Sequence, residues 1–177
     1  MSLWCVVPTY GMKLDHGWLI SRDGLISRVE MNKLSIAVAS DHAGYDLKSA
    51  LKQELEAMGH EIVDLGTHSR DSVDYPDFGY AVALALREGK ADRGVLVCGS
   101  GVGISIAANR YPEVRAALIH DPLGARLARQ HNDANVICFG GRVIEVGVAG
   151  ECLRVFLETQ FDGGRHNTRV EKLSNPL

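Results

Sequence analysis

The sequence predicts an α/β fold: a three-layer αβα sandwich on a doubly wound, five-stranded parallel sheet of Rossmann-like type, with a C-terminal helical arm. Three observations support this prediction. From Met31 onward, short apolar runs alternate with segments of helical periodicity. These pairs follow one another in series, which is the pattern of right-handed βαβ units. Polar and glycine-rich stretches follow the apolar runs, at the strand ends where open parallel sheets place their sites.

Each element has its own local signal. The strands are predicted over residues 34–40, 61–64, 93–98, 115–119 and 135–139, which are short apolar runs. The helices are predicted over residues 45–58, 77–87, 102–110, 122–130 and 145–159. In the first helix, Leu47, Leu51 and Leu55 recur at helical spacing, and Gly59 follows as a C-terminal stop signal. Pro76 stands at the entrance of the second helix, where a missing N–H is tolerated.

The organisation of the chain changes near Met31. Residues 1–30 show no sustained periodicity, and residues 31–177 are expected to form one domain. We expect Met31 to be the natural start and residues 1–30 to be an N-terminal extension, either an upstream reading-frame extension or sequence foreign to the protein. The alternative is a genuine hairpin or docking arm in which Trp4 and Trp18 pack.

Composition narrows the function classes. The chain has 177 residues, 46% of them hydrophobic, and a net charge of −3, so nothing attracts it generally to nucleic acid. Its cysteines are Cys5, Cys98, Cys138 and Cys152, and no CxxC pair indicates structural zinc. Their wide spacing favours a reducing cytoplasm over a disulfide scaffold. No apolar run approaches the roughly 20 residues of a membrane span.

Cys98 is the most informative single residue. It ends an apolar run and is followed by the glycine-rich stretch 99–103 and then by a predicted helix. A thiol at the carboxyl end of a strand, facing a helix N-terminus, sits where backbone N–H groups stabilise a thiolate and a developing oxyanion. The alternative is that Cys98 is only a small buried strand residue. The alternating glycines favour the site, because they let backbone amides approach a ligand closely.

Polar residues follow the other predicted strands as well. Asp41 and His42 follow the first, Tyr75 comes after the second, and Arg142 follows the fifth. These side chains are expected on one rim of the sheet, where a pocket belongs. Asp41 could instead cap a helix, and Asn132 could be a turn former. His131 and Asn132 follow a helix, so the strand-end rule does not place them on that rim.

Residues from about 33 to about 172 resemble the type B ribose-5-phosphate isomerase family, which includes the galactose-6-phosphate isomerase subunits. The resemblance is carried by residues 40–44 (SDHAG), 74–76 (DYP), 98–109 (CGSGVGISIAAN), 129–135 (RQHNDAN), 140–142 (GGR) and 163–170 (GGRHNTRV). It implies interconversion of an aldose phosphate and a ketose phosphate, in the pentose phosphate pathway, without metal or organic cofactor. It does not extend to the first thirty residues.

The resemblance also implies a role for each matching residue. Cys98 would be the base that moves a proton between C1 and C2, and His131 would assist opening of the furanose ring. The loop of Gly99, Ser100, Gly101, Val102 and Gly103 would stabilise the enediolate oxygens, with the Ser100 hydroxyl taking part. Asp41 and Tyr75 would lie near the sugar, and Asn132 would contact its hydroxyls. The phosphate would be bound by His42, Arg142, Arg165 and Arg169, some of them reaching over from a second subunit.

The C-terminal arm bears on oligomeric state. Arg165 and Arg169 are four residues apart, so on a helix they share one face and could hold a phosphate bidentately. A solvated helix face is the alternative. The preceding Gly163 and Gly164 favour an arm that leaves the domain and docks on a partner, giving a homodimer or a dimer of dimers with shared sites.

Other functions stay open at this point. A six-carbon substrate, allose or galactose 6-phosphate, is not distinguished by the motifs. A Cys hydrolase could use Cys98 and His131 with a carboxylate. A non-catalytic nucleotide-binding module could use the same sheet, although the glycine loop matches neither the dinucleotide fingerprint nor a P-loop.

Overall fold

The computed structural model describes residues 13–14, 18–20, 26–28 and 33–175. The chain divides into two units, Met1–Asn32 and Lys33–Leu177, and each is described by itself. In the first unit, the short strands β1 (Lys13–Leu14), β2 (Trp18–Ile20) and β3 (Ile26–Arg28) form an antiparallel sheet in that order. Trp4 and Cys5 lie outside the described residues. The status of residues 1–30 as an extension stays a prediction.

The second unit is a parallel α/β domain. Its strands are β4 (Ser35–Ser40), β5 (Glu61–Asp64), β6 (Arg93–Cys98), β7 (Ala116–Leu118) and β8 (Val136–Gly140). Its helices are α1 (Tyr45–Ala57), α2 (Tyr75–Arg87), α3 (Val102–Ala108), α4 (Pro122–Asn132), α5 (Val146–Glu158) and α6 (Asn167–Ser174), with 3-10 turns η1 (His42–Gly44) and η2 (Gly164–His166).

The strand order creates a crevice. The order is β5-β4-β6-β8-β7, and every neighbouring pair is parallel. The chain runs from β4 out to β5 and then returns past β4 to β6. The connections therefore diverge on either side of the β4–β6 boundary, which is where ligands bind in doubly wound sheets.

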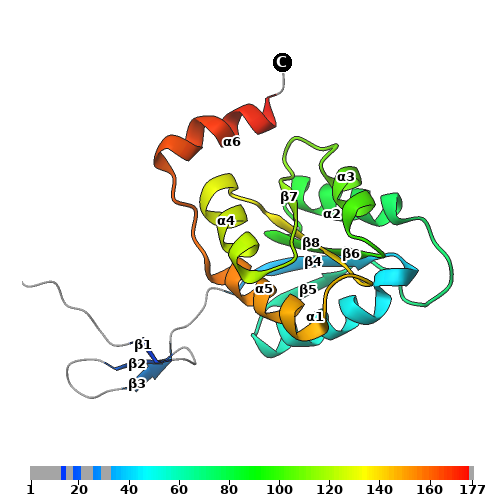
Figure 1. Ribbon diagram of the computed structural model, residues 1–177, viewed down its shortest axis with the longest axis horizontal. Coiled ribbons are helices and arrows are strands. Elements are labelled where there is room, and N and C mark those ends of the chain that lie inside the picture. Colours follow the sequence, from blue (N-terminus) through cyan, green and yellow to red (C-terminus); the bar gives the residue numbers. More distant parts are fainter. Residues whose placement is uncertain (1–12, 15–17, 21–25, 29–32, 176–177) are drawn as a thin grey trace, which may run out of the picture. The chain divides into compact units, whose positions relative to one another are not determined.

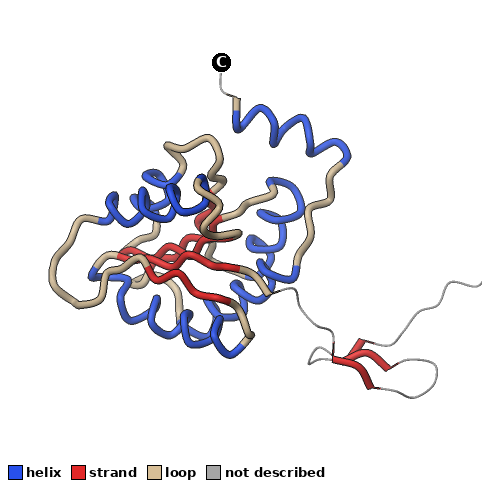
Figure 2. The backbone as a smooth tube through the Cα atoms, turned by 180° about the vertical axis from the view of Figure 1, so that it is seen from behind, coloured by secondary structure: helices blue, strands red, loops and turns tan. Residues whose placement is uncertain are grey.

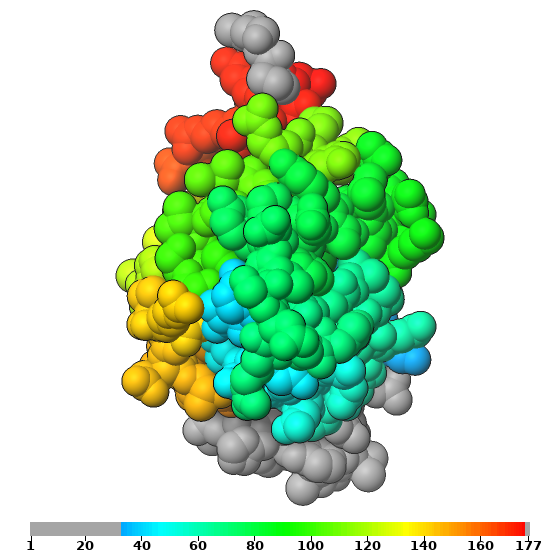
Figure 3. Space-filling model, turned by 90° about the vertical axis from the view of Figure 1, so that its right-hand side faces the viewer, coloured from blue at the N-terminus to red at the C-terminus, as the bar shows by residue number. Residues whose placement is uncertain are grey.

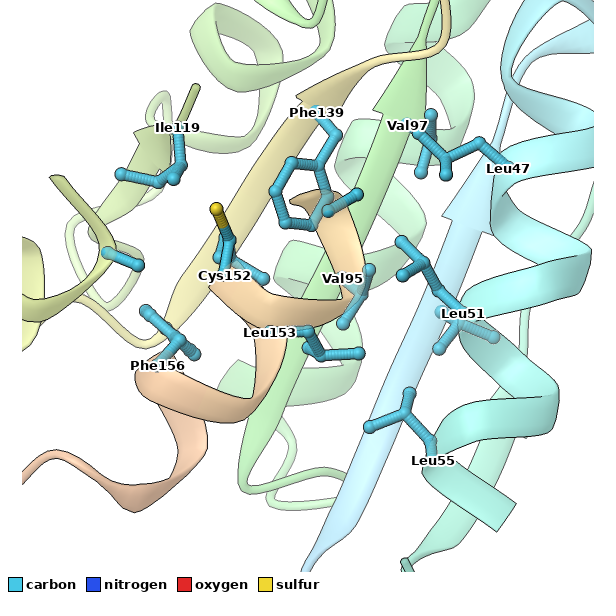
Figure 4. Close-up of a cluster of buried hydrophobic side chains, with 14 of the residues drawn as sticks. Leu47, Leu51, Leu55, Val95, Val97, Ile119, Phe139, Cys152, Leu153 and Phe156 are labelled. Carbon is cyan, nitrogen blue, oxygen red and sulfur yellow. The ribbon is translucent and has the colours of Figure 1, made fainter. Parts of the chain in front are cut away.

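Helices cover both faces of this sheet (Figures 1 and 2). On one face, α1, α4 and α5 pack through residues such as Leu51 and Phe156 onto Val95 and Phe139 (Figure 4). On the other, α2 and α3 pack onto the alternate strand residues, among them Leu96, Cys98 and Cys138. Strands buried on both faces have continuous apolar runs rather than alternating ones, which explains why the sequence pattern identified them. The predicted three-layer fold is confirmed.

Three helix ends differ from the prediction by two residues, and α3 is one of them, because it ends at Ala108 instead of residue 110. α4 continues through His131 to Asn132 instead of stopping at residue 130, because Asp133 then takes the left-handed conformation (φ 46°) and donates its N–H to the Arg129 carbonyl. α2 begins at Tyr75 rather than at residue 77, with Pro76 inside its first turn. His131 and Asn132 are therefore helical rather than part of a loop.

The C-terminal arm is formed by η2 and α6. None of the residues of α6 is buried, and Leu173 is 56% exposed. Among the residues that the structure describes, no helix is both long and apolar enough to cross a lipid bilayer.

Candidate active site

Cys98 ends β6, the central strand, and pairs with Gly140 of β8. Its side chain is 3% exposed, and the Gly101 N–H donates a hydrogen bond to its Sγ at 3.1 Å. The thiol therefore faces the glycine loop, as the sequence predicts. The amide of the glycine loop is therefore in direct contact with the sulfur atom that would have to accept a proton from carbon.

The glycine loop is packed against the end of β8. Gly101 has φ +78°, and a Cβ there would lie 2.8 Å from the Phe139 carbonyl carbon. A Cβ on Gly140 would lie 2.7 Å from the Ser100 carbonyl oxygen. Glycine is required at both positions because backbone meets backbone. The Ser100 Oγ accepts the Val102 N–H at 3.3 Å, so this hydroxyl stands at the start of α3.

Tyr75 lies against the same loop. A Cβ on Gly103 would come 2.6 Å from its ring, while the ring itself remains 41% exposed. The phenol is thus placed over the glycine loop from α2, on the side where Cys98 faces. The predicted proximity of Tyr75 and the Cys98 loop is present in the structure.

The first loop closes the opposite side of the crevice. Asp41 is 6% exposed, and its Oδ1 accepts the Gly44 N–H at 2.9 Å. This carboxylate therefore caps η1, as its structural alternative supposed, and its position at the end of β4 also puts it beside the crevice. The Val73 N–H donates to His42 Nδ1 at 3.2 Å, which ties η1 to the segment before α2.

Arg142 reaches the Cys98 loop from β8. The Arg142 N–H donates to the Gly99 carbonyl at 3.1 Å, and the Gly141 N–H donates to the Cys98 carbonyl at 2.8 Å. A Cβ on Gly99 would lie 3.7 Å from the guanidinium carbon. Arg142 also lines a cavity of about 400 Å³ with Asp46, Leu47, Gly141, Val143, Ile144, Glu145 and Val146. An anion bound there would meet a guanidinium close to the thiol loop.

Segments far apart in the sequence meet on this face of the domain. Figure 3 shows the segment near residue 40 in blue between green segments and the yellow-orange segment near residue 145. Asp41 and His42 follow β4, Arg142 follows β8, and Tyr75 begins α2. The structure thus brings together one half of the predicted site at the carboxyl edge of the sheet.

His131 and Asn132 lie at the other end of the domain. α4 starts after the carboxyl end of β7 and finishes before the amino end of β8. Arg129, in its last turn, lies 5.6 Å over the ring of Phe156, which is in the last turn of α5, the helix that starts after the carboxyl end of β8 and runs back along the sheet. Asn132 lines a pocket of about 350 Å³ together with residues such as Ala116 and Ala134, which flank the amino ends of β7 and β8. Within one chain, His131 does not meet Cys98.

The arginines of the arm stay near His131 rather than Cys98. Arg165 is in η2 and Arg169 is in α6, so they do not share one continuous α-helix, and both are exposed. Between them His166 is buried, with its ring stacked on that of His131. Burial lowers the pKa of His166, and the charges of His131, Arg165 and Arg169 lower it further. This cluster forms the second half of the predicted site residues.

Among the described residues, His131, Asp162 and His166 offer metal-ligand atoms within 4.8 Å of one another. The two imidazole rings are parallel to within 4°. A metal ion lies in the plane of each imidazole that binds it, and two stacked parallel planes share no point. In this arrangement the two imidazole rings therefore do not aim at one common point.

Sequence reasoning missed His166. The stretch 163–170 was singled out for its arginines, and the histidine between them gave no periodic or strand-end signal. Only the path of the chain after α5 shows that this side chain reaches His131. No motif surrounds His60 or His68 in the sequence, which favours a surface position for both; His68 is exposed, but His60 is buried at 8% exposure.

Comparisons with known proteins match the domain that carries these residues. The family model described as Ribose/Galactose Isomerase matches residues 36–173. Ribose-5-phosphate isomerase B of Escherichia coli is 45% identical over 139 residues, which cover 78% of this chain and 93% of that protein.

Solved structures agree. A ribose 5-phosphate isomerase of Thermotoga maritima is 48% identical, with a TM-score of 0.78 over 80% of this chain and 97% of that one. Ribose-5-phosphate isomerase B of Mycoplasma genitalium, solved with bound ribulose-5-phosphate, is 39% identical, with a TM-score of 0.75 over 79% of this chain and 93% of that one.

Proposed function

The chain belongs to the ribose/galactose isomerase family, and we propose that it interconverts ribose 5-phosphate and ribulose 5-phosphate through an enediolate. It is an aldose–ketose isomerase of the ribose-5-phosphate isomerase B type. The observation that carries the proposal is the Cys98 thiol, which takes an amide hydrogen bond inside a glycine loop at the strand ends.

Aldose–ketose isomerisation requires a base and stabilisation of negative charge on oxygen. The hydrogen on C2 of an open-chain aldose is weakly acidic, so its removal requires a positioned base. In our proposal the Cys98 thiolate takes this proton, and the electron pair forms the C1–C2 double bond of the enediolate. The thiol then returns the proton to C1, while the hydroxyl proton on O2 moves to O1, which leaves the carbonyl at C2. Donors on the loop, namely its backbone N–H groups and the Ser100 hydroxyl, stabilise the oxygen charge that develops between these two steps.

Binding completes the assignment. Asp41 and Tyr75 would line the sugar, with Gly99, Gly101, Val102 and Gly103 beside its reacting carbons. His42 and Arg142 would meet the phosphate from the same chain. Asn132, Arg165 and Arg169, with His131 as the group that opens the furanose ring, lie at the other edge of the sheet, so one chain does not assemble the whole set.

We therefore propose a homodimer in which each site takes residues from two chains. The separation of Cys98 from His131 within the chain is the first support. The second is α6, which carries Arg169 and buries none of its own residues. The third is apolar surface at helical spacing: Val102 and Ile106 on α3, and Leu123 and Leu127 on α4, are 37–63% exposed. A second copy would cover this surface and supply the missing half of the site.

The alternatives left open by the sequence are not favoured. The relatives are ribose-5-phosphate isomerases, which argues against a Cys hydrolase and a nucleotide-binding module, and against a six-carbon substrate. We propose a cytoplasmic location, supported by Cys98, Cys138 and Cys152, which are all free thiols.

A substrate panel tests the proposal. Ribose 5-phosphate and ribulose 5-phosphate should interconvert, allose 6-phosphate and galactose 6-phosphate should react far more slowly, and a chelator should leave the rates unchanged. Turnover only with a six-carbon phosphate would contradict the substrate assignment. Loss of turnover with chelator would contradict a mechanism that uses side chains alone.

A further inference from the structure

The stacked imidazole pair is held by the backbone on both sides. The centroids of the His131 and His166 rings are 4.5 Å apart, and the ring planes are 4° from parallel. His131 is in the last turn of α4. The Asp162 N–H donates to the Gln130 carbonyl at 3.1 Å, and the His166 N–H donates to the Gly163 carbonyl at 3.0 Å. The segment after α5 is thus anchored beside the end of α4, and its turn lays the His166 ring over the His131 ring.

The protonation state of His166 follows from its neighbours. The Arg165 Nε–H donates to His166 Nε2 at 3.4 Å. Because an arginine nitrogen only donates, this contact requires a lone pair on Nε2, so the ring is neutral with its proton on Nδ1. His166 is 6% exposed. The charged groups that face it are His131, Arg165 and Arg169, which lower its pKa together with burial, and Asp162, which raises it. Three of these four groups oppose a positive charge on His166.

We propose that His166 is the positioning residue of His131: its neutral ring, stacked on the His131 ring, fixes the orientation of that ring. This inference rests on the proposed function, in which His131 opens the sugar ring.

The ring-opening step shows why orientation matters. The bond between C1 and the ring oxygen breaks, and the ring oxygen takes a proton from protonated His131. The hydroxyl on C1 then gives its proton to the neutral His131, and C1 becomes an aldehyde. No proton is gained or lost overall. His131 must reach two oxygen atoms on the same carbon in turn, so a freely rotating ring would serve this step poorly.

Two reactions of the same enzyme separate this step from the carbon chemistry. Ribose 5-phosphate is a furanose and must be opened. Ribulose 5-phosphate has no ring to open, because its C5 oxygen carries the phosphate. Exchange of its C1 hydrogen with deuterium from D2O reports proton transfer at carbon alone. We would measure both reactions for wild type, His166→Ala and His166→Phe, with His68→Ala as an exposed control.

The expected pattern is selective. An aromatic pair contributes energy equivalent to about a threefold to tenfold change in rate, so His166→Ala should lower kcat on ribose 5-phosphate by that factor. Hydrogen exchange in ribulose 5-phosphate should stay at the wild-type rate. His166→Phe keeps a neutral ring and should recover most of the loss. His68→Ala should match wild type in both reactions.

Three results would overturn the inference. An equal loss in both reactions would assign His166 to phosphate binding or to folding. A His166→Phe variant as impaired as His166→Ala would assign it to its polar contact with Arg165. Wild-type kinetics in His166→Ala would show that the stack does nothing for turnover. Wild-type protein without either reaction would contradict the proposed function itself, and this inference with it.

Discussion

Replacing Cys98 tests the centre of the proposed mechanism, and the chain provides its own controls. Cys98, Cys138 and Cys152 are all nearly inaccessible, at 3%, 0% and 0% exposure. Cys138 is on the neighbouring strand β8 and faces the same helix layer as Cys98. Burial raises the pKa of the Cys138 thiol and raises that of Cys152 to about 11, so both remain protonated at neutral pH and neither can act as a base.

The expected magnitudes differ between activity and stability. Loss of a general base typically costs about 10²–10⁴-fold in rate, so Cys98→Ala should lose at least about a hundredfold in kcat. The same change leaves the Gly101 N–H without the acceptor that it has at 3.1 Å. A buried donor without a partner costs about 1–3 kcal/mol, which for a chain of this size lowers Tm by roughly 2–12 °C. Cys138→Ala and Cys152→Ala should lower Tm modestly and keep near wild-type kcat.

Cys98→Ser separates the two effects. Its hydroxyl can still accept the Gly101 N–H, so stability should lie near wild type, but a serine hydroxyl is not ionised at neutral pH and should not restore turnover. The assay is conversion of ribose 5-phosphate beside a thermal melt of each variant, and binding of the sugar phosphate should persist in both Cys98 variants. Near wild-type turnover in Cys98→Ala, or inactivity of Cys138→Ala with an intact fold, would refute the assignment of the base.

The remaining predictions concern the second half of the site and pH. Arg169→Ala and Arg165→Ala should raise KM strongly, and lysine should rescue only in part because it lacks the planar guanidinium; unchanged kinetics in both would make the arm a solvated surface. Mixed under subunit exchange, inactive Cys98→Ala and Arg169→Ala chains should regain part of the activity, because one site of the mixed dimer then carries no defect; no recovery with exchange verified would exclude the shared site. His60 is 8% exposed, its Nδ1 accepts the Leu34 N–H at 3.3 Å, and burial lowers its pKa. As pH falls, His60 therefore binds a proton in the unfolded chain at a higher pH than in the folded chain. The stabilisation of the fold by neutral His60 is complete above a pH of about 6.5 and is lost as pH falls below it. Melts from pH 7.5 to 5 should show a smaller decline for His60→Leu than for wild type, and equal declines would contradict the assignment.

The sheet and the carboxyl-edge half of the site could be predicted from the sequence. Central strands such as β6 are buried on both faces, so their apolar runs are continuous and bounded by glycine. Because parallel strands end at one rim, the loops after them converge there, and Asp41, Tyr75 and Arg142 lie near the Cys98 loop as expected.

The rest depended on contacts that no local pattern contains. The end of α4 is set by Asp133, whose side chain is held by Arg115 and Arg129 at 2.8 Å each. Arg115 directly precedes β7, and Arg129 is in α4 itself. The residue type at position 133 alone therefore does not show where the helix ends. The position of His166 over His131 depends on how the chain returns after α5. The sequence motif pointed to this stretch for its arginines and assigned no role to its histidine.

The glycine packing around the crevice has a thermodynamic consequence. A Cβ on Gly44 would lie 2.6 Å from the Val97 carbonyl oxygen, and one on Gly141 would lie 2.8 Å from the Ala43 carbonyl oxygen. These contacts, together with those of Gly101 and Gly140, pack the loops after β4, β6 and β8 against one another through their backbones. Such loops have almost no alternative conformations to lose when a ligand arrives.

Immobilising loops and side chains on binding is a large part of the entropic cost of association. In this domain the backbone around the thiol is already ordered by folding. Binding of a small, highly polar ligand therefore does not have to order these loops. The glycines thus act as preorganisation of the site before any substrate is bound. Variation in substrate size would have to come from the side chains around this frame, because the frame itself has no room to change.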